Sequence, residues 1–357
     1  MKTLAFALLI LIACGDTSKG DSTDTDITSS ETLLTDVPDT TDTTPHRPDP
    51  AGDLRFDQIQ TLGTHNSYHV LDGAPADPSH DYSHPPLSAQ LDAGIRHFEL
   101  DIHRDPTGGP HRVYHIVGVD PGTTCQTLAD CLTEVRTWSL ANPDHHLIVI
   151  LIEPKDDVAR IFDDIGQDPK NSGEDLWDGH VASIDDIIAA IFPDRILTPA
   201  TFRARSTPAA ATVRESLEDQ GFPTIAETRG QVAFVLNDTS ALRTEYRAAG
   251  EGLMFVFGEV GDDHAAFVKA DDPQSDPARI TRAVTNGYVV RTRADADLVI
   301  DLERRDAALA SGAQLITTDF PSPIPVTEGY AVWLDAHPSQ CNPVTAPPTC
   351  DAATIEP

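Results

Sequence analysis

The chain has 357 residues, 39% of them hydrophobic, which is enough for a substantial buried core. It carries 57 acidic and 25 basic residues, so its formal net charge is −32. A chain this acidic lacks the basic surface that neutralises nucleic-acid phosphates, which argues against nucleic-acid binding. The charge suits an exported protein or a site that holds a hard cation. Average domain sizes would allow two domains, but α/β barrels of this length commonly form one.

The first residues, MKTLAFALLILIACGD, have the pattern of an export signal. Lys2 precedes an apolar run that is too short to span a bilayer, and small residues follow it. The ending LIAC, residues 11–14, resembles a bacterial lipobox, which predicts that Cys14 becomes the lipidated first residue of the mature protein. The alternative is an ordinary secretory signal cut near Ala13. Both interpretations predict export, and the lipobox adds an anchor to the cell envelope or cell surface.

A segment rich in Thr, Asp, Ser and Pro extends from residue 15 to about residue 51. It has few large apolar side chains, so it cannot bury enough surface to offset the entropy of ordering. We therefore predict three regions: a lipoprotein signal peptide over 1–14, a disordered linker over 15–51 and a globular domain over 52–357. We expect this domain to be monomeric.

Four cysteines remain once Cys14 is set aside. In an exported chain this number fits two disulfides, and proximity in the sequence favours the pairs Cys125–Cys131 and Cys341–Cys350. Zinc binding is the alternative interpretation. It is the weaker one, because neither pair has the usual spacing of zinc ligands.

Short apolar runs recur through the globular region and alternate with polar or helix-like stretches. The predicted strands cover residues 56–62, 94–102, 112–117, 146–153, 231–237, 253–258, 288–293 and 314–320. Patterns such as PLSAQLDA (86–93) and RRDAALASG (304–312) indicate helices between them. Eight strands that alternate with helices predict a parallel (β/α)₈ barrel, the TIM-barrel fold.

Polar side chains lie at the ends of the first four predicted strands, where barrel enzymes have their active sites. These are His65 and Asn66 after the first strand, Glu99 and Asp101 in the second, His115 in the third and Glu153 in the fourth. The alternation of a strand puts Glu99 and Asp101 on one face and their apolar neighbours on the other. Each residue alone has an ordinary explanation as a turn, cap or solvated loop residue. Their succession over four strands predicts a functional site.

Three carboxylates at one barrel mouth repel each other unless a cation lies among them or some are protonated. Carboxylate and amide oxygens are ligands for Ca²⁺ or Mg²⁺ rather than for zinc. We therefore predict a Ca²⁺ site with the ligands Asn66, Glu99, Asp101 and Glu153. Two histidines beside such a cation, His65 and His115, supply a general base and a general acid.

The remaining histidines have ordinary interpretations. The sequence holds 14 histidines in all. His111 shares a face with His115 but comes earlier in the predicted strand, so it is expected to fall short of the mouth. The other histidines near these segments are predicted to be loop or cap residues: His69, His80, His84, His145 and His146.

In order and approximate spacing these residues resemble those of the phosphatidylinositol-specific phospholipases C, in the Ca²⁺-dependent branch. The segments GTHNSY, FELDI and ITTDFP are similar to its bacterial members, and the resemblance covers about residues 53–321. It implies a barrel fold, a phospholipid substrate and Ca²⁺ as cofactor. It also implies that His65 and His115 are the catalytic pair, and that the four oxygen-bearing residues named above hold the metal.

The reaction expected from this resemblance is an intramolecular phosphoryl transfer. The inositol 2-hydroxyl attacks phosphorus, diacylglycerol leaves, and a cyclic inositol phosphate forms and can be hydrolysed further. Lys155, Lys269 and Arg291 are candidates for binding the phosphate or the hydroxyls of the substrate. Their alternative role is a surface ion pair with a nearby carboxylate. Asp319 either orients a group of the site or caps the last turn.

Two other functions compete with this prediction. A glycerophosphodiester phosphodiesterase shares the barrel, a Glu-x-Asp pair and a following histidine. After the first strand, however, that family has a motif like HRG, whereas this chain has HNS. A non-catalytic lipoprotein that binds surface lipid or glycan is the other alternative. The intact acid, base and ligand positions argue against the non-catalytic alternative.

Overall fold

A computed structural model describes residues 49–321, 330–334 and 337–356. The predicted signal peptide, Cys14 and all but the last residues of the predicted linker lie outside this part of the chain. Within it, no helix is both long enough and apolar enough to cross a membrane. Asp49, the first described residue, forms an ion pair in which its carboxylate lies 2.8 Å from the guanidinium of Arg229.

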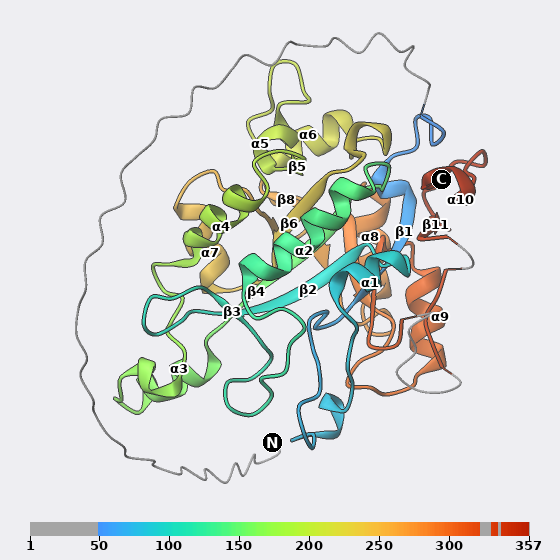
Figure 1. The fold of residues 1–357 in the computed structure, drawn as a ribbon. Coiled ribbons are helices and arrows are strands. Elements are labelled where there is room, and N and C mark those ends of the chain that lie inside the picture. The colour runs from blue at the N-terminus through green and yellow to red at the C-terminus, as the bar shows by residue number, and fades with distance from the viewer. Residues whose placement is uncertain (1–48, 322–329, 335–336, 357) are drawn as a thin grey trace, which may run out of the picture. The chain divides into compact units, whose positions relative to one another are not determined.

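Eight parallel strands form a closed barrel in the described chain (Figure 1). In order around the barrel they are β1 (Ile59–Thr64), β10 (Leu315–Thr318), β9 (Val289–Arg293), β8 (Ala265–Lys269), β7 (Phe255–Phe257), β6 (Val232–Leu236), β4 (Ile148–Lys155) and β2 (His97–His103). The pairing of Gly63 in β1 with His97 in β2 closes the ring. The predicted TIM barrel is therefore confirmed.

The closure of the barrel depends on a glycine. A Cβ atom on Gly63 would lie 2.1 Å from the imidazole of His97, far inside contact distance. The His97 ring is buried, and its Nε2 lies 3.1 Å from the hydroxyl of Thr317 in β10. The absence of a side chain at position 63 thus lets β1 and β2 approach each other with this ring between them.

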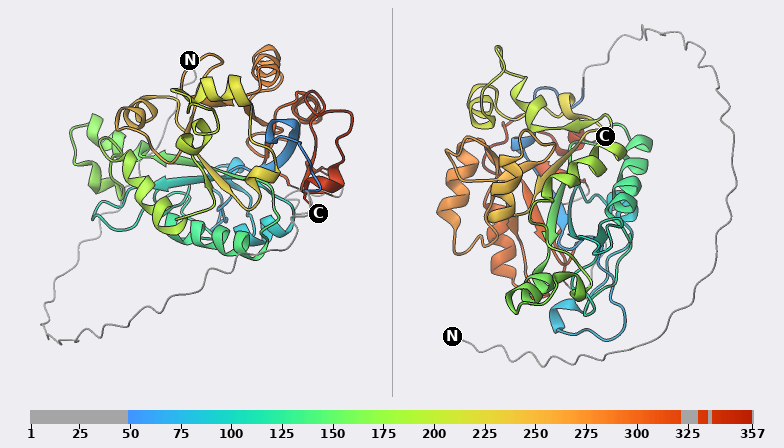
Figure 2. Two further views of the ribbon diagram at one scale, coloured as in Figure 1. Left: turned by 90° about the horizontal axis from the view of Figure 1, so that it is seen from above. Right: turned by 90° about the vertical axis from the view of Figure 1, so that its left-hand side faces the viewer.

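Helices surround the strands, as the two views of Figure 2 show. They are α1 (Leu87–Asp92), α2 (Leu128–Ala141), α3 (Asp157–Asp164), α4 (Ile184–Ile191), α5 (Pro199–Arg203), α6 (Val213–Gln220), α7 (Ala241–Ala248), α8 (Pro277–Thr285), α9 (Leu302–Ala310) and α10 (Ala352–Ile355). Both helices named from the sequence, over 86–93 and 304–312, are confirmed by α1 and α9.

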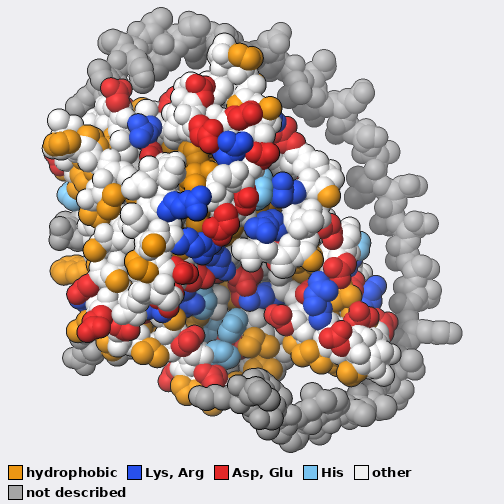
Figure 3. Space-filling view, turned by 180° about the vertical axis from the view of Figure 1, so that it is seen from behind, with side chains coloured by type: hydrophobic (Ala, Val, Ile, Leu, Met, Phe, Trp, Pro, Cys, Tyr) orange, Lys and Arg blue, Asp and Glu red, His pale blue; other side chains and the backbone are white. Residues whose placement is uncertain are grey.

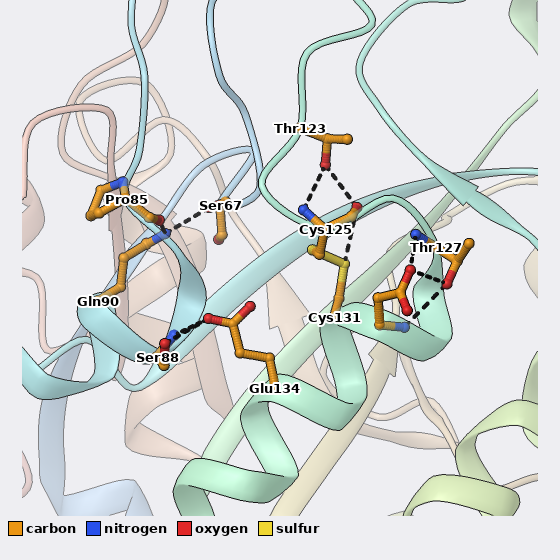
Figure 4. The surroundings of a disulfide bond; sticks show 10 residues. Ser67, Pro85, Ser88, Gln90, Thr123, Cys125, Thr127, Cys131 and Glu134 are labelled. Carbon is orange, nitrogen blue, oxygen red and sulfur yellow. Dashed lines mark hydrogen bonds between the residues drawn. A yellow bond between two sulfur atoms is a disulfide. The ribbon is translucent and has the colours of Figure 1, made fainter.

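Both predicted disulfides, Cys125–Cys131 and Cys341–Cys350, are present. The first lies at the beginning of α2, where Thr127 caps the helix (Figure 4). The same helix contacts α1, because Glu134 accepts hydrogen bonds from the backbone and hydroxyl of Ser88. The disulfide therefore fixes the loop that enters α2 to the first turn of that helix.

Seven of the eight predicted strands correspond to barrel strands, and the prediction for residues 112–117 is wrong. Here β3 (Arg112–Val113) is a two-residue strand that runs antiparallel to β2 outside the barrel. The chain then turns back on itself, because the backbone of Ile116 pairs with that of Asp120. The true eighth barrel strand is β8, which the sequence prediction missed.

Two short strands complete the sheet. β5 (Ile196–Leu197) pairs with β6, and β11 (Ser339–Cys341) pairs antiparallel with β1. The interior of the barrel and the layer beneath the helices form a continuous apolar core. Strand β4 is apolar and buried from Ile148 to Ile152, as expected for a strand covered on both faces.

Buried histidines should make this fold sensitive to acid. Burial lowers the pKa of His97 to about 3 and that of His146 to about 3. Both rings are neutral in the folded protein, whereas in the unfolded chain they take up protons below about pH 6.5. Stability is therefore retained above pH 6.5 and falls as the pH drops from 6.5 towards 3. The expected loss is about 2 kcal/mol per histidine at about pH 5.

Urea unfolding at neutral pH and at about pH 5 measures this loss. The control is His146→Gln, which has no imidazole to protonate at this position. Between the two pH values the variant should lose about 2 kcal/mol less than the parent protein. Equal losses in both proteins would contradict the assignment to buried neutral histidines.

Candidate active site

The segment Thr64–Tyr68 turns at the carboxyl end of β1 and is held by both neighbouring strands. The backbone N–H of His65 donates to Thr318 in β10, and that of Ser67 donates to Glu99 in β2. Asn66 lies between them with a φ of 43°, a left-handed conformation that asparagine tolerates better than most residues. His65 and Asn66 therefore lie in a tight turn at the carboxyl end of β1, in which His65 is partly exposed and Asn66 is buried against Tyr82.

His65 forms a pair with Asp319, which follows β10. The Nδ1 atom of His65 lies 3.0 Å from Oδ1 of Asp319. Arg293 of β9 reaches the same carboxylate at 3.4 Å. Burial raises the pKa of Asp319, but His65 and Arg293 outweigh burial and hold this pKa well below its usual value. A carboxylate fixed on Nδ1 leaves Nε2 of His65 as the nitrogen that can exchange a proton. Asp319 thus orients His65.

Strands β2 and β4 bring three carboxylates together at the mouth. Their register pairs Asp101 directly with Glu153, and Glu99 lies two residues earlier on the same face as Asp101. Glu99 and Asp101 are buried, whereas Glu153 is partly exposed. The sequence prediction of a shared face for these residues is therefore confirmed.

One oxygen of this cluster has no partner. Oδ1 of Asp101 is buried and makes no hydrogen bond of standard geometry among the described residues, although the hydroxyl of Tyr68 lies near this carboxyl group. Burial raises the pKa of Asp101 well above its usual value; Lys155 lowers it, and Glu153 raises it further. A desolvated carboxylate oxygen beside two other carboxylates is an environment that a cation would stabilise.

A lysine supplies positive charge at this place. The Nζ atom of Lys155 lies 2.5 Å from Glu153 and 3.8 Å from Asp101. Asp101 and then Glu153 raise the pKa of Lys155 well above its usual value, although burial lowers it. Amide and carboxylate oxygens, as in Asn66, Glu99, Asp101 and Glu153, are the ligands that Ca²⁺ prefers. The chemistry of these side chains therefore suits a calcium ion, although the oxygens of the three carboxylates do not all lie within 4.8 Å of one another in this structure.

Glu99 is bound by two side chains that come from other strands. Its Oε2 accepts from the guanidinium of Arg291 at 2.8 Å, and its Oε1 accepts from Asn237 at 2.7 Å. Burial raises the pKa of Glu99, but Arg291 outweighs burial and holds this pKa well below its usual value. A carboxylate has about four lone-pair directions, so both oxygens can still ligate a metal.

The three basic residues predicted to bind substrate differ in their surroundings. Arg291 is 1% exposed, and its donors are taken by Glu99, Asp271 and Thr317. This arrangement favours the ion-pair alternative for Arg291. Lys269 is partly exposed, and its Nζ donates to Asn237 at 2.9 Å. Lys155 and Lys269 therefore remain accessible at the mouth, whereas Arg291 does not.

His115 lies in the loop after β3 rather than at the end of a barrel strand, and Asp120 is its partner. Its Nδ1 lies 2.9 Å from Oδ2 of Asp120. The same carboxylate is 2.9 Å from Nε2 of His69 and 3.5 Å from Nδ1 of His80. Burial raises the pKa of Asp120, but hydrogen bonds from His115 and His69 outweigh burial and lower it well below its usual value. We call His69, His80, His115 and Asp120 the Asp120 cluster.

The loop between residues 65 and 84 connects the Asp120 cluster with the His65–Asp319 pair. His84 lies within 3.0 Å of the backbone oxygen of His65, and the ring of Tyr82 contacts both His84 and His69. The predicted loop or cap positions of His69, His80 and His84 agree with the course of the backbone. The side chains of His69 and His84 are nevertheless buried, and His80 faces Asp120.

Several residues of the site escaped the sequence prediction. Asn237 follows β6 and contacts Glu99, Glu153 and Lys269. Arg293 and Asp120 complete the two histidine pairs. The only signal in the sequence was the position of Asn237 and Arg293 at the ends of apolar runs and that of Asp120 five residues after His115. On the face shown in Figure 3, histidine side chains gather beside interspersed basic and acidic side chains.

Comparisons with known proteins agree with this geometry. Residues 54–112 and 110–343 match the family model of phosphoinositide phospholipase C, Ca²⁺-dependent. A calcium-dependent phosphoinositol-specific phospholipase C from a Gram-negative bacterium, Pseudomonas sp., has 18% sequence identity and a TM-score of 0.56. The match covers 83% of this chain and 97% of that one. No curated protein sequence gives a significant match.

A second similar structure is a Ca²⁺-dependent phosphatidylinositol-specific phospholipase C from Streptomyces antibioticus. Its sequence identity is 21% and its TM-score is 0.54, over 74% of this chain and 95% of that one. At these identities the structural matches support the fold, and the family model, which spans most of the chain, supports the family. The resemblance noted in the sequence is thereby confirmed. The chain belongs to the family of Ca²⁺-dependent phosphoinositide phospholipases C, so it is a phosphoric diester hydrolase with calcium as its cofactor.

Proposed function

We propose that this enzyme cleaves phosphatidylinositol-type phospholipids to diacylglycerol and a cyclic inositol phosphate. One observation supports this function above all. Strands β2 and β4 bring three carboxylates together at the barrel mouth, and each proposed catalytic histidine lies within hydrogen-bonding distance of an aspartate, Asp319 or Asp120. Neither a binding protein nor a structural lipoprotein needs two carboxylate-oriented imidazoles together with such a cluster of carboxylates.

In this proposal His65 and His115 divide the proton transfers. A general base takes the proton of the inositol 2-hydroxyl, whose oxygen then attacks phosphorus, and a general acid protonates the departing diacylglycerol oxygen. Asp319 and Asp120 hold the Nδ1 side of the two rings, so each ring presents the other nitrogen to the substrate.

The calcium ligands in the proposal are Asn66, Glu99, Asp101 and Glu153. When bound, calcium supplies charge stabilisation for the phosphate oxygens and lowers the pKa of a coordinated hydroxyl. Arg291 and Asn237 keep Glu99 ionised and fixed in orientation. Arg291 therefore acts through Glu99 rather than by touching the substrate.

Lys155 and Lys269 are the accessible cations of the mouth. Both side chains are about a quarter exposed, and both contact residues of the carboxylate cluster or its partner Asn237. Ammonium groups in this position can pair with the phosphate or with inositol hydroxyls. We propose that Lys269 contacts the substrate directly and that Lys155 turns to it when a metal occupies the carboxylates.

Large apolar side chains are exposed on loops that follow the carboxyl ends of barrel strands. Val119 is 50% exposed in the loop after β2, and Val299 is 59% exposed in the loop after β9. Trp333, which follows β10, is 63% exposed. The three residues therefore lie on segments at the end of the barrel that carries the site, where exposed apolar side chains suit contact with lipid. They support a membrane-borne substrate over a water-soluble diester.

The two disulfides support an exported enzyme, because such bonds persist in oxidising compartments. Anchoring through a lipid on Cys14 remains part of the proposal. An acidic body tethered in this way would be repelled from anionic bilayers at low salt.

The test is product identification by phosphorus NMR. The purified domain is incubated with phosphatidylinositol vesicles or with glycerophosphoinositol, each with calcium. A cyclic inositol phosphate formed from phosphatidylinositol alone is the expected result. Cleavage of glycerophosphoinositol instead would favour the glycerophosphodiesterase alternative, and no product from either would contradict the proposal.

A further inference from the structure

The Asp120 cluster has more metal-ligating atoms than the orientation of His115 requires. One aspartate and one imidazole form a sufficient pair, yet two further histidines face the same carboxylate. Ligand atoms of His80, His115 and Asp120 all lie within 4.8 Å of one another. The described part of the chain has no other group of three histidine, cysteine or acidic side chains placed in this way.

Distances in the cluster fit a small tetrahedral ion. Oδ2 of Asp120 lies 2.9 Å from Nδ1 of His115 and 3.5 Å from Nδ1 of His80. Zinc bonds of about 2.0–2.1 Å in tetrahedral geometry separate neighbouring ligand atoms by about 3.3 Å. Small side-chain rotations would therefore place three ligands around one ion.

His80 has a nitrogen without a partner. Its Nδ1 is buried and makes no hydrogen bond, although it faces Asp120. Its ring packs edge-on against that of His115, with centroids 4.7 Å apart.

His69 contacts Asp120 from the buried side of the cluster. It is fully buried, and its Nε2 lies 2.9 Å from both oxygens of Asp120. A buried group that hydrogen-bonds a ligating carboxylate fixes the orientation of that ligand, as outer-shell partners of metal sites do. His80 and His115, by contrast, are partly exposed, so an ion can reach them.

We infer that His80, His115 and Asp120 form a second metal site, selective for zinc or a similar transition-metal ion, whose occupation inhibits the enzyme. Two imidazoles and one carboxylate suit zinc, whereas the all-oxygen cluster suits calcium, so the two ions sort to different sites. Zinc on Nδ1 of His115 leaves the only ring proton on Nε2. The imidazolium form needed by a proton donor then cannot arise.

The proposed metal binding does not depend on the proposed function. The proposed inhibition does rest on that function, because inhibition requires His115 to act as an acid or a base. Zinc titration by calorimetry in excess calcium keeps the carboxylate cluster filled, and activity on phosphatidylinositol vesicles is measured in the same buffers. Cobalt in place of zinc adds the visible absorption of a four-coordinate nitrogen–oxygen site.

The variant His80→Gln removes one ligand, and His180→Gln, at an exposed histidine outside the cluster, is the matched control. Loss of an outer-shell partner costs about 10–100-fold in metal affinity, so loss of a ligand should cost at least about 100-fold. We expect one zinc ion to bind the parent protein and His180→Gln, and zinc binding and zinc inhibition to disappear together in His80→Gln, with inhibition measured relative to each protein's own zinc-free activity.

The possible failures are distinguishable. Zinc affinity that is equal in the parent and His80→Gln would overturn the site, whatever the activity. Binding that depends on His80 but leaves activity unchanged would uphold the metal site and remove His115 from the proposed proton transfers. Binding that depends on His80 in a protein without phospholipase activity would uphold the site and overturn the proposed function.

Discussion

Replacing either proposed catalytic histidine, in His65→Ala or His115→Ala, is expected to lower the turnover of phosphatidylinositol by about 10²–10⁴-fold. The reason is the loss of a positioned proton donor or acceptor, which water at the mouth cannot replace with the same geometry. Vesicle assays that follow inositol phosphate release measure the effect. Both side chains are partly exposed, so neither substitution leaves a large cavity in the core.

His180→Ala is the control for these variants, since it removes an imidazole from an exposed position. It should retain parental activity. Thermal unfolding of all three variants should stay within a few degrees of the parent. Parental turnover in His65→Ala would refute its assignment, and a large drop in unfolding temperature would assign the loss of activity to folding instead.

Removal of calcium is the second change with a large expected effect. Chelation by EDTA should lower activity at least about 100-fold, because stabilisation of developing charge on the phosphate contributes several kcal/mol to the transition state. Added calcium should restore it. Calcium should also raise the unfolding temperature, since a ligand that binds only the folded state stabilises by about 2.7 kcal/mol at 100 times its Kd.

Asp101→Asn separates this site from other effects of chelation. The substitution removes the buried carboxylate whose oxygen has no partner, and it should abolish the calcium-dependent rise in unfolding temperature. Asp306→Asn, at an exposed carboxylate, should leave that rise unchanged. A calcium response that persists in Asp101→Asn would show that the ion binds elsewhere.

Local patterns determined much of the architecture in advance. Apolar runs predicted most of the strands, and the two-residue alternation of β2 placed Glu99 and Asp101 on one face. Proximity in the sequence was enough for both disulfides. Each of these features depends on residues that are close together in the sequence. Composition and periodicity describe such local patterns, so they were sufficient for these predictions.

Other features were beyond such reasoning. Strand β8 is five residues long and two of its members are alanines, so it gave no strong apolar signal. The segment 112–117 gave such a signal, yet only Arg112 and Val113 pair with β2, and the chain then turns back so that Ile116 pairs with Asp120. A run of β-forming residues extends a sheet only if a neighbouring strand is there to accept its hydrogen bonds.

For this protein the sequence by itself determined the barrel, the disulfides and the membership of a calcium-dependent enzyme family. The tertiary structure decided which partners the residues of the site have. Asp319 reaches His65 across 254 positions, and Arg291 reaches Glu99 across 192. Asp120 gathers three histidines from two loops. Such contacts form because barrel closure brings distant strand ends to one mouth, and no local pattern records which ends will meet there.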